Sequence, residues 1–208
     1  MSIFGRIVTN SMVEAAVLEL VNVWADTGLA EVERQSGVTV GLIQRPRAYA
    51  AAFDFDNWQE EQLPAVYAVS PGPAQLERAG GDRYTAIYPL DVGVFVNDQT
   101  EPLVRGAASA YQMAVAMIVA QNGGIGALAA TRTEWIGGAL RLPDPDNRTL
   151  ALATCEFHIV ISDVLDGGAG PASPNPAASP EYGGAPEAPF NAWPTVSSTI
   201  VAAHARPI

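Results

Sequence analysis

The sequence predicts an α+β protein. Its sheet is mixed and mainly antiparallel, with about four to five strands, two main helices packed on one face and an extended C-terminal arm. Residues 82–97 alternate with the two-residue period of a strand and lead into the almost uncharged helical segment 103–120. Two further strand-like segments, 134–142 and 148–165, follow as a hairpin. From Gly167 the composition changes to Gly, Pro, Ala and Ser, which is typical of chain outside a packed core.

The first predicted helix begins near Ser11, because Glu14 stands three positions later and completes the pattern of a capping box. Gly28 is placed to end this helix in a left-handed cap, and Glu14 is expected on its solvent side. Four apolar residues at helical spacing predict its buried stripe. They are Val13, Val17, Leu20 and Trp24. The segment 38–44 (VTVGLIQ) then reads as a strand.

The centre of the chain combines loops, a short strand and the second helix. Residues 47–63 read as a long loop, 63–72 as a short strand and 73–82 as a polar connection. Thr100 is placed as the N-cap of the second helix, and Pro102 fits its first turn because amides there have no partner within the helix. This helix is apolar on nearly all sides, so we expect it to be covered on several sides.

Three parts follow one another along the chain. An α+β domain covers residues 1–165, a Gly/Pro/Ala/Ser-rich linker 166–189 and a C-terminal docking segment 190–208. The linker has too few apolar residues to offset the entropy lost on ordering, which predicts a flexible or extended chain. The last segment carries apolar residues that we expect to dock on a partner: Phe190, Trp193, Val196 and Ile200. Plain C-terminal disorder is the alternative.

The chain is acidic and apolar. Among its 208 residues 49% are hydrophobic and 16% are charged, the formal net charge is -11, and Lys is absent. So small a charged share predicts a surface that a partner partly covers. Gripping a nucleic-acid backbone needs clustered cations, so the acidity argues against such a surface but allows one past which DNA slides. A GC-rich coding sequence is an alternative cause of the missing lysines.

The sequence gives no sign of secretion or membrane insertion. The N-terminus lacks an apolar run long enough for a secretory signal. Residues 103–120 are the one candidate membrane span, but they are short, carry Arg105 and are built largely from Ala, so we expect a packed helix. Cys155 is the single cysteine, which excludes an intrachain disulfide.

We expect no catalytic, cofactor-binding or metal site, because the sequence lacks the residue clusters that such sites need. Glu156 and His158 share a strand face, but no further His or Cys stands at ligand spacing. Cys155 has no nearby base in the sequence and is typical of a small core residue. Asp54 and Asp56 could form an acid/base pair, although turn formation explains them more simply.

The order of the elements is itself informative: a capped helix, a strand, a long loop, a short strand ending in SPG, a long strand, a second helix and a closing hairpin. This order resembles the tail terminator proteins of long-tailed bacteriophages, also called tail completion, minor tail protein U-like or neck proteins. The resemblance covers about residues 11–165. It is carried by LPAVYAVSPG (63–72), the strand 84–96, the helix 103–120, EWIGGALRL (134–142) and TLALATCEFHIVISDVL (149–165).

The resemblance implies a structural protein of the virion, located in the phage tail or neck and assembled in the host cytoplasm. It implies a homohexameric ring that caps the tail tube and ends its polymerisation. The implied partners are copies of the chain itself, the tail tube protein and the head-tail connector or head-closure protein. DNA would pass through the lumen without specific binding, and no cofactor, catalytic residue or membrane is implied. The extension past Leu165 departs from the small family members, so its target (a neighbouring subunit, the tube or the connector) stays open.

Two sets of residues are candidates for contacts in such a ring. An all-apolar helix needs cover, which closed rings supply through repeated heterologous contacts, and Arg pairs well at interfaces. The candidate subunit-interface residues are Arg105, Ser109, Gln112, Met113, Met117, Arg47, Arg78 and Arg83. The acidic candidates for a ring face or the lumen are Asp54, Asp56, Glu60 and Glu61. Ordinary solvated surface is the alternative for each set.

Other functions stay open. One is a different protein of the same machine: a head-closure or connector-adaptor protein, or a tube subunit, although the two helices argue against the last. Another is a small enzyme, such as a hydrolase that uses His158. A third is an adaptor that binds its partner through the C-terminal segment.

Overall fold

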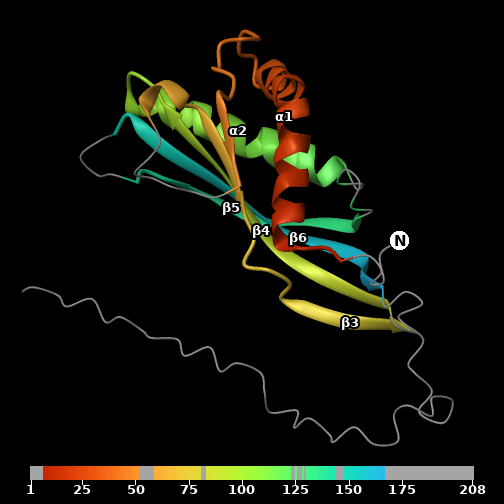
Figure 1. Ribbon diagram of the computed structural model, residues 1–208. Coiled ribbons are helices and arrows are strands. Elements are labelled where there is room, and N and C mark those ends of the chain that lie inside the picture. The colour runs from red at the N-terminus through yellow and green to blue at the C-terminus, as the bar shows by residue number, and fades with distance from the viewer. Residues whose placement is uncertain are drawn as a thin grey trace, which may run out of the picture. The chain divides into compact units, whose positions relative to one another are not determined.

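The structure is a computed structural model that describes residues 7–51, 59–80, 83–122, 125, 128, 130–143 and 148–166 (Figure 1). The helices are α1 (Asn10–Gln35), the short 3-10 helix η1 (Glu60–Gln62) and α2 (Glu101–Gln121). The strands are β1 (Ala48–Ala50), β2 (Ala65–Val69), β3 (Gln75–Gly80), β4 (Arg83–Asn97), β5 (Ala130–Arg141) and β6 (Leu150–Asp166). The predicted α+β class is confirmed, with a sheet of six strands where four to five were expected.

The strands form one mixed sheet in the order β1-β2-β4-β6-β5. β3 pairs with the first half of β4, on the same edge that β2 pairs with further along. The β1–β2 pair is parallel, and the other described pairs are antiparallel. β4 and β6 pair along nearly their whole length and form the centre of the sheet. β5 therefore lies at one edge of the sheet and β1 at the other.

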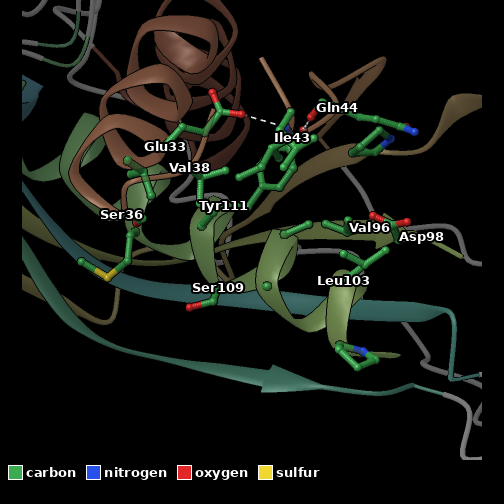
Figure 2. Close-up of a pocket in the computed structure, with 18 of the residues that line it drawn as sticks. Glu33, Ser36, Val38, Ile43, Gln44, Val96, Asp98, Leu103, Ser109 and Tyr111 are labelled. Atoms are coloured by element: carbon green, nitrogen blue, oxygen red, sulfur yellow. Dashed lines mark hydrogen bonds between the residues drawn. The ribbon is translucent and has the colours of Figure 1, made fainter. Parts of the chain in front are cut away.

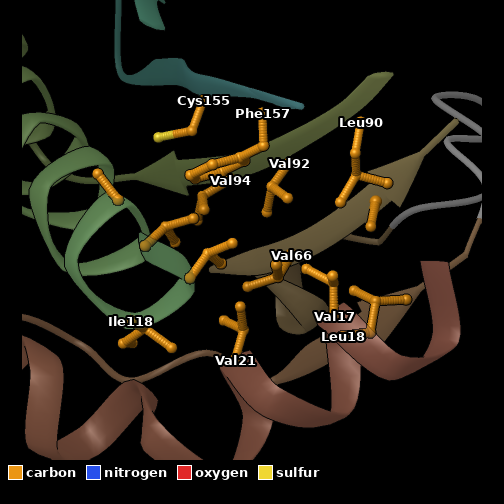
Figure 3. Close-up of a cluster of buried hydrophobic side chains, with 14 of the residues drawn as sticks. Val17, Leu18, Val21, Val66, Leu90, Val92, Val94, Ile118, Cys155 and Phe157 are labelled. Atoms are coloured by element: carbon orange, nitrogen blue, oxygen red, sulfur yellow. The ribbon is translucent and has the colours of Figure 1, made fainter. Parts of the chain in front are cut away.

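Both helices cover the same face of the sheet (Figure 1). α2 packs against β4, β5 and β6, while α1 packs across α2 and against β2. Beneath them, the even-numbered residues of β4 from Ala86 to Val96 and the odd-numbered residues of β6 from Ala151 to Ile161 are buried. Figure 3 shows side chains from both helices meeting those of the central strands in this core. The sheet and α1 thus cover much of the apolar surface of α2.

α2 is also long and apolar enough to cross a membrane, the only such helix in the described part of the chain. In this fold it packs as a core helix, with Val104, Ala108 and Val115 buried. Thr100 is its N-cap and Pro102 lies in its first turn, as the sequence predicted.

The start of α1 differs from the prediction. Its N-cap is Thr9, not Ser11, and the Thr9 hydroxyl accepts a hydrogen bond from the amide of Met12 at 3.3 Å. Glu14 does not face solvent. It is buried, and its carboxylate accepts a hydrogen bond from the amide of Ser70 at 2.8 Å, which ties α1 to the end of β2.

The end of α1 also differs, because Gly28 lies within the helix, which continues to Gln35. A Cβ added at Gly28 would lie 2.8 Å from Cδ1 of Ile118 on α2. Glycine is therefore needed here for close packing of the two helices and not as a helix end. Trp24, expected in the buried stripe, is 45% exposed.

Three predictions for the chain between the first helix and β4 were wrong, since the predicted loop 47–63 also contains β1 and η1. The segment 38–44 is a turn and not a strand, with Gly41 at a φ of 90°. The first strand is instead the short β1. Within 73–82, expected to be a polar connection, the chain forms β3, because its backbone pairs with the start of β4.

The face of the sheet away from the helices carries a second, smaller apolar cluster. Leu63, Ala65 and Phe95 are buried there, and Tyr67 packs against them. A Cβ added at Gly93 would lie 2.2 Å from the Tyr67 ring, so glycine makes room for this ring on the sheet.

Two acidic side chains face each other elsewhere on this open face, and their removal gives a first test of the fold. Asp91 of β4 lies opposite Glu156 of β6. Partial desolvation, and then the charge of Glu156, raise the pKa of Asp91, so the folded state disfavours its ionised form. We expect Asp91→Asn to increase the free energy of unfolding at neutral pH by about 0.5 kcal/mol, a gain that solvent screening keeps small.

Urea denaturation of both proteins measures this gain. It should shrink as the pH falls through the raised pKa, because Asp91 of the unchanged protein then becomes neutral. The control is Glu19→Gln, at an exposed position on α1. A gain no larger than that of Glu19→Gln would contradict repulsion across the sheet.

Candidate subunit interface

An apolar groove of about 420 Å³ lies between α2 and the segment that follows α1 (Figure 2). Leu103, Ala107 and Met113 contribute to the α2 wall. Residues of the segment 36–44 form the opposite wall, and Val96 at the end of β4 also lines the groove. The groove therefore lies on the helical side of the sheet, near the last residues of β4.

Glu33, near the end of α1, holds the outer wall of the groove. Its buried carboxylate accepts hydrogen bonds from the amides of Gly41 (2.9 Å) and Ile43 (2.7 Å) and from the guanidinium of Arg45 (3.0 Å). Burial by itself would raise the pKa of Glu33, but these donors together hold it below its ordinary value. In a strand, the amides of segment 38–44 would bond to a neighbouring strand. Here the ionised carboxylate of Glu33 accepts hydrogen bonds from two of them instead.

Tyr111 ties α2 to the same wall. Its side chain is 2% exposed, and its hydroxyl donates a hydrogen bond to the carbonyl oxygen of Gln44 at 2.5 Å. Desolvation raises the pKa of Tyr111, so the hydroxyl stays a donor at neutral pH. The Glu33 carboxylate and the Tyr111 hydroxyl are therefore both engaged within the chain, on a lining that is otherwise mainly apolar.

Large apolar side chains stand exposed on both walls of the groove. Leu103 and Met113 on α2 are 51% and 48% exposed, and Leu42 on the opposite wall is 68% exposed. Val38 and Val40 of the same segment are exposed as well. A gathering of exposed apolar side chains of this kind marks an interaction site more often than isolated ones do.

A polar hollow of about 570 Å³ adjoins the groove. Its charged lining residues are Arg47, Glu60 and Glu61, together with Asp98, which also lines the groove. Arg47 donates a hydrogen bond to the carbonyl oxygen of Glu61 at 3.4 Å. Three acidic groups and one basic group make this hollow negative at neutral pH.

A second exposed apolar site lies on the edge strand β5. Trp135 and Ile136 are 45% and 48% exposed, and the pairing of β5 with β6 shifts between Trp135 and Gly137. Such a bulge lets adjacent side chains change direction. The Trp135 indole N–H donates to the carbonyl oxygen of Gly137 at 2.6 Å. This bond restrains the ring in its exposed position.

The α2 residues predicted at a subunit interface fall in different places. Ser109 and Met113 line the groove. Met117 lines a separate hollow between α1 and α2 beside Trp24. Arg105 is exposed and forms an ion pair of 2.8 Å with Glu101, one turn earlier in α2.

Gln112 is engaged within the subunit. Its side-chain amide donates to the carbonyl oxygen of Thr154 on β6 at 3.0 Å. An added Cβ at Gly138 of β5 would lie 2.4 Å from the same amide nitrogen. Gln112 therefore lies between α2 and the sheet, where it fixes the helix on β5 and β6.

The structure does not bring all the predicted arginines together. Arg47 lines the polar hollow, whereas Arg78 and Arg83 are exposed near the start of β4, at the other end of this strand from the groove. Among the acidic candidates, Glu60 and Glu61 line the hollow, and Asp54 and Asp56 lie outside the described residues. The predicted docking residues also lie outside them: Phe190, Trp193, Val196 and Ile200.

The residues considered for chemistry are placed as follows. Cys155 is buried, and burial raises the pKa of its thiol to about 12, so the thiol stays protonated at neutral pH. His158 is partly buried and lies opposite Glu134 of β5. In the described ranges, no group of three or more His, Cys, Asp or Glu residues is arranged to hold a metal ion.

Sequence reasoning missed Trp135, Ile136 and Leu42 as surface residues. Trp135 and Ile136 are adjacent and both apolar, which breaks the alternation of β5 and was a signal for a bulge. Leu42 was assigned to a strand that does not form, so its exposure had no signal in the pattern.

No family model matches this sequence, and no curated protein matches it.

Proposed function

We propose that this chain is a tail terminator of a long-tailed bacteriophage. In this proposal it forms a ring, a hexamer, that caps the tail tube, ends tube polymerisation and joins the tail to the head connector. The observation that supports the proposal best is the apolar surface that a single subunit leaves exposed. Among the described residues it comprises Ile7, Met12, Val23, Trp24, Val38, Val40, Leu42, Val69, Leu76, Leu103, Met113, Trp135 and Ile136.

The subunit covers only part of α2 by itself. Tyr111 and Val119 are buried, whereas Met113 is 48% exposed and Met117 is partly exposed. In a closed ring each copy contacts two neighbours through two different surfaces. Both exposed apolar sites, the groove beside α2 and the site on β5, can therefore be covered. Apolar surface that stays exposed does not stabilise an isolated subunit, whereas its burial between copies would stabilise an assembly.

The charge of the chain supports a role as a DNA conduit. A formal net charge of -11 repels the phosphate backbone, so DNA would pass a lumen of this composition without being trapped. The negative hollow with Glu60 and Glu61 is a candidate for the surface that faces the lumen or one side of the ring. We propose no catalytic activity and no cofactor.

Polymerisation of the tail tube protein encoded in the same genome tests this proposal. We expect tubes to stop lengthening when the full-length chain is added, because a cap occupies the growing end. Electron microscopy measures tube length, and serum albumin at equal concentration is the control. Tubes that lengthen as in the control, while the chain stays in the supernatant after sedimentation, would contradict the proposal.

A further inference from the structure

We propose that Trp135 and Ile136 of one copy enter the apolar groove of the next copy, so that subunits join head to tail. This inference rests on the proposed function, since it names the two surfaces through which the ring would close. The occupant of the groove is thus a second copy of the chain.

The inserted element has the properties of an interface anchor. Trp135 and Ile136 stand side by side on an edge strand, each about half exposed. The hydrogen bond from the Trp135 indole to Gly137 holds the ring in one position before any partner arrives. A restrained aromatic side chain loses little entropy on binding, which is one reason that Trp dominates binding energy at interfaces.

The groove has matching properties. Its volume of about 420 Å³ falls within the size range of pockets that take large side chains or small ligands. Leu103, Met113 and Leu42 present apolar atoms on its two walls. The hydroxyl of Tyr111 and the carboxylate of Glu33 are already bonded within the chain. An apolar group can therefore enter without removing a partner from either of them.

The two surfaces are built from different elements. Trp135 and Ile136 belong to β5, the edge strand beside β6. The groove is lined by residues that precede β1 and β2, such as Gln44 and Pro64, and by the end of β4. A contact between two different surfaces is heterologous. It leaves one free surface of each kind, so it continues until the chain of copies closes.

Charge favours the same pairing. β5 carries Arg132 and Arg141 against one acidic residue, Glu134. The polar hollow beside the groove carries Glu60 and Glu61, and Asp98 lies between the hollow and the groove. Glu134 pairs with Arg132 at 2.9 Å, so the net positive charge of β5 comes from Arg141. This edge strand still gains complementary charge against the acidic margin, whereas two copies of the margin would repel each other.

Cysteine cross-linking of full-length chains tests the contact. Ile136→Cys and Leu103→Cys change exposed positions on the two surfaces, and the native Cys155 is buried. With copper phenanthroline as the oxidant, we expect a disulfide-linked dimer when the two variants are mixed. Neither variant alone should form this dimer, since each then carries only one of the two positions. The control mixes Leu103→Cys with Leu76→Cys, an exposed position on β3.

A mixing experiment gives an independent readout. Ile136→Asp blocks the inserted element and Met113→Asp blocks the groove, both at exposed positions. Each change should weaken self-association at least tenfold, because it buries a charge in an apolar contact. A mixture of the two variants should form one-to-one dimers and nothing larger, because only one intact surface of each kind remains. Native mass spectrometry measures the species, and thermal unfolding checks that both variants fold.

Three outcomes would overturn the inference. If both aspartate variants still form wild-type assemblies, rings close through other surfaces, and the proposed function stands without this contact. If Phe190→Ala with Trp193→Ala abolishes association while Ile136→Asp does not, the occupant is the C-terminal segment. If the wild-type chain stays monomeric and the mixed Ile136→Cys and Leu103→Cys variants give no cross-link, this contact does not form, and the tube-capping experiment decides separately on the function.

Discussion

Replacing Glu33 by alanine is expected to lower the free energy of unfolding by about 3 kcal/mol, the largest effect of a single charged residue in the described fold. The Glu33 side chain is fully buried, and its carboxylate satisfies the amides of Gly41 and Ile43 as well as Arg45. Alanine would leave both amides without their acceptor, and Arg45 would keep only Asp26 (3.7 Å) and the carbonyl oxygen of Ile43 (3.0 Å). The outer wall of the groove would then lose its anchor on α1, so self-association should also weaken.

Urea denaturation measures the loss, and Glu31→Ala is the matched control. Glu31 lies two residues earlier in the same helix and pairs with the exposed Arg34, so its removal should leave stability nearly unchanged. Equal losses for the two variants would contradict the role assigned to Glu33.

The pH dependence of Glu33→Gln gives a second check on the same group. Because the folded protein holds the pKa of Glu33 below its ordinary value, the ionised carboxylate stabilises the fold fully above the ordinary range for Glu. This stabilisation is lost as the pH falls through the lowered pKa. The difference in unfolding free energy between the wild type and Glu33→Gln should therefore shrink below about pH 4. A difference that stays constant down to about pH 2 would show that folding does not lower the pKa of Glu33.

Replacing Leu90 by alanine is expected to lower the free energy of unfolding by about 3 kcal/mol. Leu90 lies in the middle of β4, is fully buried beneath the helices and belongs to the main core (Figure 3). The change removes apolar contact and leaves a cavity that the long, paired strands β4 and β6 cannot easily close.

Leu76→Ala is the control, because it makes the same change on β3 at a position 48% exposed. Its effect should stay within about 0.5 kcal/mol. Both substitutions lower strand propensity by a similar amount. Comparing the denaturant unfolding of the two variants therefore cancels this shared contribution. Similar values at the two positions would contradict the assignment of the core to the helical face of the sheet.

The sequence predicted the central elements because their periods are long and regular. β4 alternates over most of its length, and its even-numbered residues from Ala86 to Val96 are buried beneath the helices. The same alternation in β6 placed Cys155 and Phe157 on the buried face. α2 stood out through its length and apolar composition, and its N-terminal boundary followed from Thr100 and Pro102.

The first half of the fold was harder to predict because tertiary contacts decide it. Glycine favours a helix end, but α1 continues through Gly28, which packs closely against Ile118 of α2. The pattern of 38–44 suits a strand, yet the buried Glu33 carboxylate takes up its amides. A helical residue that bonds to a turn several positions later leaves no periodic signal, so local pattern reasoning cannot find it.

The candidate interface was predictable only in part. Ser109 and Met113 were chosen from the face of α2 and do line the groove, whereas Gln112 on the same helix contacts the sheet. The groove itself needs the turn 36–44, which the sequence pattern had assigned to a strand. Trp135 became a candidate only through its exposure at a bulge, and bulges depend on the register between two strands.

The mass of the native assembly tests the ring most directly. Native mass spectrometry of the full-length chain, alone and with tail tubes, should show a closed species of about 131 kDa, six copies of a 21.8 kDa chain. The same species should bind tube ends. A chain that stays at 21.8 kDa at every concentration and has no affinity for tubes would contradict the account.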